Sequence, residues 1–125
     1  GCKCKHADFV AAHADADALV DRMNKFDDGR STGGWEKRVW ENAGWHYEAF
    51  KEIGGTRAEI TVSVDKSGLH TPPLPTTYGA WLQSSDHGIG QIISPYVATP
   101  ELAFSLMLEE AQRRVNLLQK CIDNI

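Results

Sequence analysis

The sequence of 125 residues contains no long hydrophobic run and no excess of positive charge. No apolar stretch approaches the roughly 20 residues needed to span a bilayer, and the start of the chain lacks the apolar region of a signal peptide. The formal net charge of −4 argues against a dedicated nucleic-acid-binding protein, because such proteins are usually basic. These absences predict a cytoplasmic protein without a membrane segment.

Cysteine is scarce, and its positions do not suit a disulfide framework. The three cysteines are Cys2, Cys4 and Cys121, so two are almost adjacent and the count is odd. Cys2, Cys4 and His6 would share one side of an extended segment, but zinc sites usually take four ligands, often from Cys-x-x-Cys pairs. We therefore predict no metal site. Residues 1–7 are expected to be a flexible lead-in to a single domain over residues 8–125.

The motifs that mark common catalytic sites are also missing. The chain has no Gly-x-Ser-x-Gly elbow, no Walker-type loop, no Rossmann fingerprint and no zinc-protease helix. His46, Glu48, Asp86 and His87 are the acid–base groups near expected turns or strand ends. We predict no catalytic residue and no cofactor. The alternative is a small enzyme with an unrecognised site around His46 and His87.

The clearest pattern that is present predicts a long helix at the C-terminal end of the sequence. Thr99 suits the N-cap position and Pro100 suits the first helical position. Apolar residues then recur at alternating spacings of four and three, at Phe104, Leu108, Ala111, Val115, Leu118, Ile122 and Ile125. The first half of this helix is apolar on most sides and the second half only along this stripe. We expect the first half to be buried on a sheet and the second half to contact another helix.

An N-terminal helix is predicted from Asp8 to a stop near Gly29. Its apolar residues at helical spacing are Phe9, Ala12, Ala16, Leu19, Val20 and Met23. The alanine-rich face would allow a second helix to approach closely. The second half of the C-terminal helix is its expected partner.

Three strands are predicted between the helices, over residues 57–65, 77–84 and 89–93. In the first of them apolar residues alternate with polar ones, at Ala58, Ile60, Val62 and Val64. This alternation is typical of an antiparallel sheet covered on one face. Residues 45–53 fit either a fourth strand or a short helix, and we favour the strand because aromatic residues cluster there. The sequence thus predicts an α+β domain with three to four antiparallel strands, one face covered by the long C-terminal helix, plus an N-terminal helix.

The order of the last four elements resembles that of small β-β-β-α domains such as the HicB-type antitoxin fold. The resemblance is one of layout, and the chain carries no signature residues of that family. It implies a nucleic-acid-binding β-β-β-α module as a further alternative. The negative net charge and the shortage of basic residues in the final helix argue against that alternative.

Five residues form an aromatic and basic cluster that we predict to bind a ligand: Trp35, Arg38, Trp40, Trp45 and Tyr47. Aromatic rings beside guanidinium groups suit a flat or anionic ligand, and they also suit a protein interface. The alternative is that the tryptophans close one end of the core. We predict a small soluble, non-catalytic binding protein for a protein or a small anionic or aromatic ligand. It would be of the compact kind common in phage and mobile-element genes.

The apolar stripe of the C-terminal helix continues to Ile125, and this predicts a homodimer. A helix of about 25 residues is about 37 Å long, which is more than short strands can cover. The uncovered stripe could pack on the N-terminal helix or on its own copy across a two-fold axis. We favour the homodimer, with the N-terminal helix joining the contact.

Overall fold

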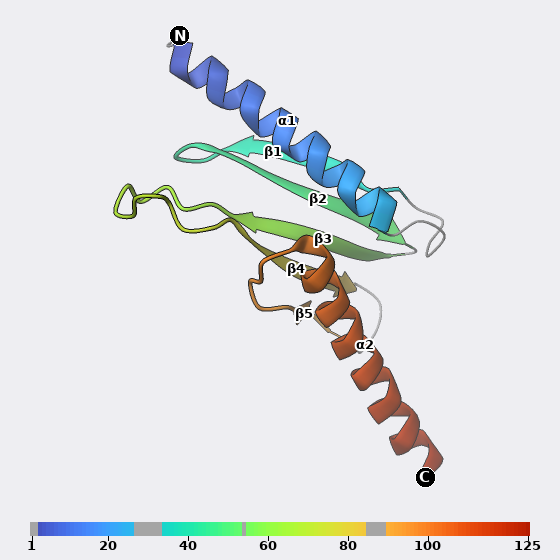
Figure 1. Ribbon diagram of the computed structural model, residues 1–125. Helices are drawn as coiled ribbons and strands as arrows, with labels where there is room; N and C mark the ends of the chain where they lie inside the picture. Colours follow the sequence, from blue (N-terminus) through green and yellow to red (C-terminus); the bar gives the residue numbers. More distant parts are fainter. Residues whose placement is uncertain (1–2, 27–33, 54, 85–89) are drawn as a thin grey trace.

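The computed structural model describes residues 3–26, 34–53, 55–84 and 90–125. Its elements are α1 (Lys3–Phe26), β1 (Glu36–Glu41), β2 (Trp45–Ile53), β3 (Thr56–Ser63), β4 (Thr77–Ser84), β5 (Ile92–Ile93) and α2 (Pro100–Asp123). The five strands form one antiparallel sheet in the order of the sequence, β1-β2-β3-β4-β5 (Figure 1). The predicted α+β class is confirmed, but the sheet has five strands rather than three to four.

The strand missing from the prediction is β1. Its sequence Glu-Lys-Arg-Val-Trp-Glu has no alternation of apolar and polar residues, and four of its six residues are exposed at the edge of the sheet. Residues 45–53 form β2, which confirms the strand over the short helix. The predicted strand over residues 89–93 is shorter, since β5 comprises Ile92–Ile93 and residue 89 lies outside the described part of the chain.

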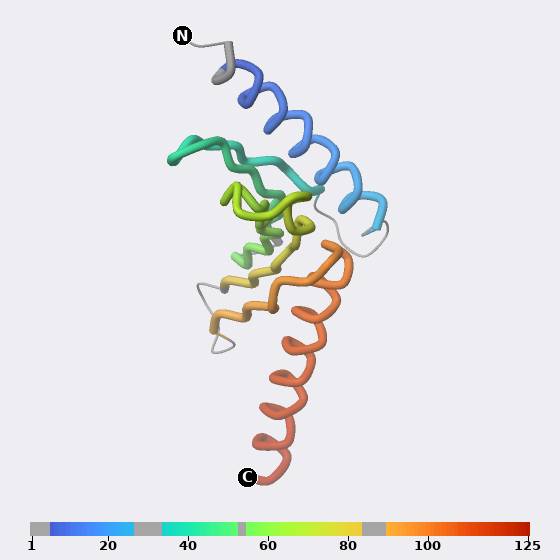
Figure 2. Tube along the Cα trace, turned by 60° about the vertical axis from the view of Figure 1, so that its left-hand side comes forward, coloured from blue at the N-terminus to red at the C-terminus, as the bar shows by residue number. Residues whose placement is uncertain are grey.

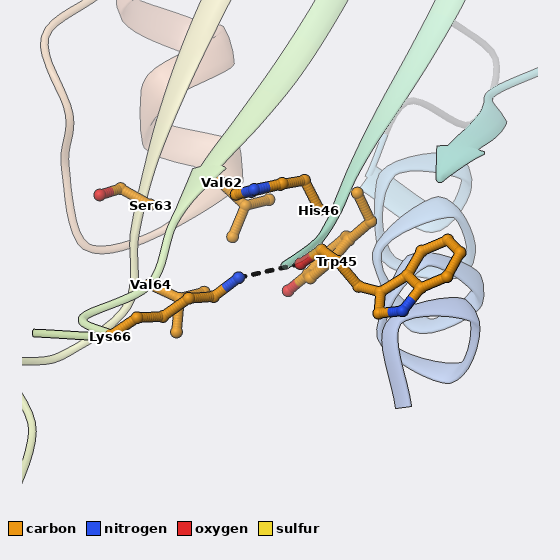
Figure 3. A pocket seen from close by; sticks show the side chains of 7 residues that line it. Trp45, His46, Val62, Ser63, Val64 and Lys66 are labelled. Carbon is orange, nitrogen blue, oxygen red and sulfur yellow. Dashed lines mark hydrogen bonds between the residues drawn. The ribbon is translucent and has the colours of Figure 1, made fainter. Parts of the chain in front are cut away.

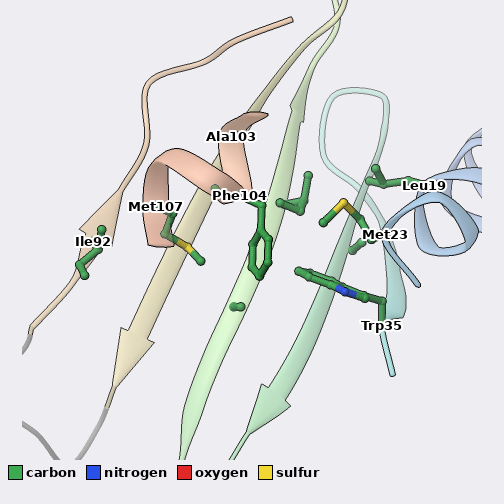
Figure 4. Close-up of a cluster of buried hydrophobic side chains, with 11 residues drawn as sticks. Leu19, Met23, Trp35, Ile92, Ala103, Phe104 and Met107 are labelled. Atoms are coloured by element: carbon green, nitrogen blue, oxygen red, sulfur yellow. The ribbon is translucent and has the colours of Figure 1, made fainter. Parts of the chain in front are cut away.

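Both helices pack on the same face of the sheet. α1 lies over β1 and β2, and the first half of α2 lies over β4 and β5 (Figures 1 and 2). The core between the helices and the sheet consists of Leu19, Met23, Trp35, Ala49, Ala58, Ile60, Ala80, Ile92, Ala103, Phe104 and Met107 (Figure 4). The other face of the sheet carries no helix among the described residues, and we call it the uncovered face.

The prediction that α1 packs on the second half of α2 is wrong. The small side chains of Ala12 and Ala16, followed by Leu19 and Met23, bring α1 close to the sheet instead. The two helices meet near one end of each, where Arg22 Nη2 donates a hydrogen bond to Glu101 Oε2 at 2.9 Å. α1 also begins earlier than predicted, at Lys3 rather than Asp8.

The first half of α2 follows the prediction in outline. The Leu102 amide donates to Thr99 Oγ1 at 3.2 Å, which confirms the N-cap, and Ala103, Phe104 and Met107 are buried against the sheet. Leu102 and Leu108 belong to the half that was expected to be buried, but both are exposed. Val64, expected beneath the helix, is exposed as well because β3 ends at Ser63.

The second half of α2 extends beyond the sheet (Figure 2). Every residue from Val115 to Ile125 is exposed, among them the apolar side chains of Val115, Leu117, Leu118 and Ile122 in α2 and of Ile125 beyond its end at Asp123. Over the part of the chain that the structure describes, neither helix combines the length and the apolar content needed to cross a membrane.

Candidate functional site

The sheet divides the predicted cluster among three environments. Successive side chains of a strand point to opposite faces, and residues paired across two strands share a face. β1 and β2 pair Arg38 with Glu48 and Trp40 with His46 on the uncovered face. Trp45 and Tyr47 therefore lie on the helix-covered face. Trp35 precedes β1 and is buried in the core.

Arg38, Trp40 and His46 form a stack on the uncovered face, which we call the Arg38–Trp40–His46 stack. The guanidinium carbon of Arg38 lies 4.9 Å from the centre of the Trp40 ring. The ring of His46 lies 5.7 Å from that of Trp40, and the two planes are 26° apart. His46 Nε2 is also 2.8 Å from the backbone oxygen of Asn42, which fixes the imidazole. The stack presents flat, cationic and aromatic surface at the β1–β2 edge.

A second arginine group lies beside the stack, around Arg57. Arg57 Nε donates to Glu59 Oε1 at 2.6 Å, and its guanidinium carbon lies 3.9 Å from the centre of the Phe50 ring. Glu48 lies between the two arginines, 3.3 Å from Arg38 Nη1 and 3.7 Å from Arg57 Nη2. Burial raises the pKa of Glu48, and the negative charge of Glu59 raises it further, although both arginines act in the opposite direction. The uncovered face thus carries a connected network of charged and aromatic groups.

Trp45 and Tyr47 contact the N-terminal helix. The rings of Trp45 and Phe9 meet edge to face with centroids 5.0 Å apart. Tyr47 packs at the edge of the core, where burial raises its pKa to about 12, with Asp15 and Tyr78 adding to the effect. Both residues lie on the opposite side of the sheet from Arg38 and Trp40. A single small ligand would therefore not contact all four.

Trp35 belongs to the core. The residue is 4 % exposed, its ring meets that of Phe104 edge to face at 5.5 Å, and its amide donates to Asn24 Oδ1 at 2.8 Å. Lys51 is buried beside it, with Nζ 5.3 Å from the centre of the indole ring, and burial lowers the pKa of this lysine. For Trp35 the structure favours the alternative in which a tryptophan fills the core.

A pocket of about 180 Å³ opens between β2 and β3 at one end of the sheet (Figure 3). Lys66 reaches across it, and its Nζ donates to the backbone oxygen of Trp45 at 2.9 Å. The side chains around it are Trp45, His46, Tyr47, Val62, Ser63, Val64 and Lys66. A more open hollow of about 760 Å³ lies between the segment after β3 and residues 96–98. His46 thus belongs both to the Arg38–Trp40–His46 stack and to the lining of the smaller pocket.

Of the candidate acid–base residues, His46 and Glu48 are described and lie on the same face of β2. Asp86, His87 and Cys2 lie outside the described residues, and the side chain of Cys4 is likewise not described. Among the described residues there is no group of three or more His, Cys, Asp or Glu side chains that could hold a metal ion. His46 has no carboxylate among the residues that line its pocket.

His46, Glu48, Phe50 and Arg57 lie on one surface that was not predicted from the sequence. The alternation of β2 alone would place His46, Glu48 and Phe50 on the same face, opposite Trp45 and Tyr47. What the sequence did not provide was the register with β1, which adds Arg38 and Trp40 to that face.

No family model matches the chain, and no curated protein or solved structure shows significant similarity to it.

Proposed function

We propose that this chain is a non-catalytic binding protein that contacts a partner protein through the uncovered face of its sheet, around Arg38 and Trp40. The observation that supports this most directly is the Arg38–Trp40–His46 stack on that face. Trp and Arg supply a large share of the binding energy in protein interfaces. Ring and guanidinium are already stacked in the free chain, so binding would cost little ordering entropy.

A protein partner fits this face better than a small ligand does. Small-molecule sites are usually concave, with volumes of about 300–1,000 Å³. Arg38 and Trp40 line neither the pocket of about 180 Å³ nor the hollow of about 760 Å³. Apolar groups farther along the same face, Ile93 and Tyr96, are about half exposed and would extend a broad contact. Binding of a small anionic or aromatic ligand is the alternative outcome of the experiment below.

Photo-cross-linking in cells of the native host tests the proposal. A benzophenone amino acid replaces Glu36, which is exposed on the same face as Arg38, and in a matched control it replaces Lys37, which points to the other face and pairs with Asp17. We expect one protein adduct from position 36 that position 37 does not give. Equal adducts from both positions would contradict the proposed surface. A thermal shift with nucleotides or aromatic acids, lost on Trp40→Ala, would indicate the small ligand instead.

We also propose that the chain forms a homodimer through the second half of α2. This half carries an apolar stripe at heptad spacing, at Val115, Leu118 and Ile122, and all three are exposed. Such a stripe is unusual on a surface left in water. Glu110 accepts hydrogen bonds from Arg113 and Arg114 within the helix, which lowers its pKa to about 2. These charges are therefore already paired beside the stripe.

An antiparallel pairing fits the shape of the chain. It would set Val115 opposite Leu118 of the partner subunit and Leu108 opposite Ile125 of the partner subunit. The flanking positions, Gln112 and Gln119, are uncharged and would not repel their copies. The two sheets would lie at opposite ends of a shared segment about 27 Å long, at 1.5 Å per residue. A parallel pair would instead force the two sheets side by side.

A further inference from the structure

The sheet is split between β2 and β3 at the end that contains the small pocket. The pairing of β2 with β3 ends at Glu48↔Thr61, although both strands continue beyond it. Beyond that point Trp45 to Tyr47 pair with β1, and Val62 and Ser63 pair with β4. The pocket of about 180 Å³ fills the space between the separated strands (Figure 3). We call this space the β2–β3 notch.

The β3 wall of the notch presents backbone groups. Residues of an antiparallel strand direct their N–H and C=O groups to alternate neighbours. Tyr78 on β4 exchanges both its backbone hydrogen bonds with Val97, each at 2.8 Å, so its peptide groups point away from β3. Val62 is the residue paired with Tyr78. The N–H and C=O of Val62 therefore point toward β2, into the notch.

The β2 wall presents backbone groups as well. At the β1–β2 turn the Asn42 amide donates to the Gly44 oxygen at 2.8 Å, which sets the alternation along this hairpin. The backbone groups of His46 then point to Trp40, and those of Trp45 and Tyr47 point toward β3. The hydrogen bond from Lys66 Nζ to the Trp45 oxygen agrees with this direction. The ammonium of Lys66 occupies a position where a peptide N–H could donate.

We propose that the β2–β3 notch binds an extended segment of a partner protein, which inserts as an additional strand and pairs with both walls. Unpaired strand edges are templates for another chain, and main-chain pairing of this kind is a recurring mode of peptide recognition. Here two such edges face each other. The inserted segment would replace the exposed Lys66 ammonium, run antiparallel to one wall and parallel to the other, and extend the strand pairing to this end of the sheet.

The surroundings of the notch define the segment that fits. Side chains of an inserted strand would alternate between the uncovered face, beside His46 and Ser63, and the α1 side, beside Tyr47 and Val62. The hollow on the α1 side continues under the helix for about 370 Å³ and is lined by Asp8 and Asp15. We therefore infer an apolar residue facing Tyr47 and Val62, with a basic residue two positions away that reaches the two carboxylates.

The probe is a phage-displayed library of linear seven-residue peptides, selected on the wild-type chain, with the best sequence then synthesised. We expect micromolar binding, and slower amide hydrogen exchange on binding within residues 45–47 and 62–64. A copy of the peptide N-methylated at alternate residues keeps every side chain but loses half its donors, and it should bind at least 10-fold more weakly. Lys66→Ala should bind the parent peptide as well as wild type or better.

Several results would overturn the notch as a peptide site. These are the absence of enriched peptides, equal binding of the N-methylated copy, or protection that maps to α2 or the uncovered face. A doubled mass that persists in the Leu118→Glu variant would show that a second copy of this chain fills the notch. Arg38 does not line the notch, so Arg38→Ala should leave peptide affinity within about two-fold. A negative result for the notch can therefore be distinguished from a negative result for the proposed partner surface around Arg38 and Trp40.

Discussion

Arg38 and Glu48 face each other across β1 and β2, with 3.3 Å between Arg38 Nη1 and Glu48 Oε1. Glu48 is buried, with 3 % of the residue exposed, although it lies on the face that no described helix covers. Arg38 and Arg57 contact its carboxylate from two sides. Part of the uncovered face therefore contains a buried side chain that is held by its neighbours, as side chains in the core are.

Glu48 gives the stability of the chain a specific pH dependence. Because the pKa of Glu48 is raised, the folded chain binds this proton more readily than the unfolded chain, where the value is near 4.5. The stabilisation that comes from protonated Glu48 is fully present below the pKa of the unfolded chain. It is lost as the pH rises through the pKa of Glu48 in the folded chain. Glu48→Gln cannot titrate, so its free energy of unfolding should rise relative to wild type over this range. Urea denaturation at a series of pH values measures the difference, and a difference that stays constant or falls would contradict the assignment.

The two tryptophans that flank Arg38 in sequence should respond differently to replacement. Trp35 is buried against Phe104, so Trp35→Ala should lower the free energy of unfolding by about 3–5 kcal/mol. Trp40 is partly exposed on the uncovered face, and Trp40→Ala should cost about 1 kcal/mol or less. Chemical denaturation of both variants tests this. Equal losses would mean that the cluster is not divided as the sheet register requires.

The proposed homodimer depends on the stripe of α2. Leu118→Glu would force two carboxylates into one apolar contact and should weaken the dimer by on the order of 100-fold. Asn116→Glu, which adds the same carboxylate on the side of the helix away from the stripe, is the matched control and should leave most of the dimer intact. Light scattering at micromolar concentration gives the mass of each. A wild-type mass equal to that of one chain would refute the dimer.

The separation of β2 from β3 can be measured with paired cysteines in a background without the native ones. Phe50 and Glu59 are paired across the two strands, so Phe50→Cys with Glu59→Cys should form a disulfide readily. His46 and Ser63 would be paired if the strands stayed together, but they lie beyond the end of the pairing at Glu48↔Thr61. Their cysteine variants should oxidise at least 10-fold more slowly. Comparable rates would show a closed sheet.

Local patterns in the sequence were enough to predict α2, β3 and β4, because each carries a cap or an apolar alternation. β1 could not be predicted, because Glu36, Lys37 and Arg38 carry no apolar signal and the strand exists through its pairing with β2. The alanine face of α1 was recognised, but a small-residue face fits a sheet as well as a helix. No local feature of the sequence distinguished a sheet from a helix as the packing partner of this face. The residue types of the candidate site were predicted from the sequence. How these residues divide between the two faces of the sheet and the core was not, because that depends on the pairing of Trp40 with His46.

The most direct test of the account is the affinity of the partner captured at position 36 for three variants of the chain. Arg38→Ala and Trp40→Ala should each weaken binding by about 10-fold or more, which corresponds to at least about 1.4 kcal/mol. Lys37→Ala, whose side chain is next to Arg38 in sequence but on the opposite face, should remain within about two-fold of wild type. If all three variants bound alike, or if Lys37→Ala alone lost affinity, the uncovered face would not be the binding surface.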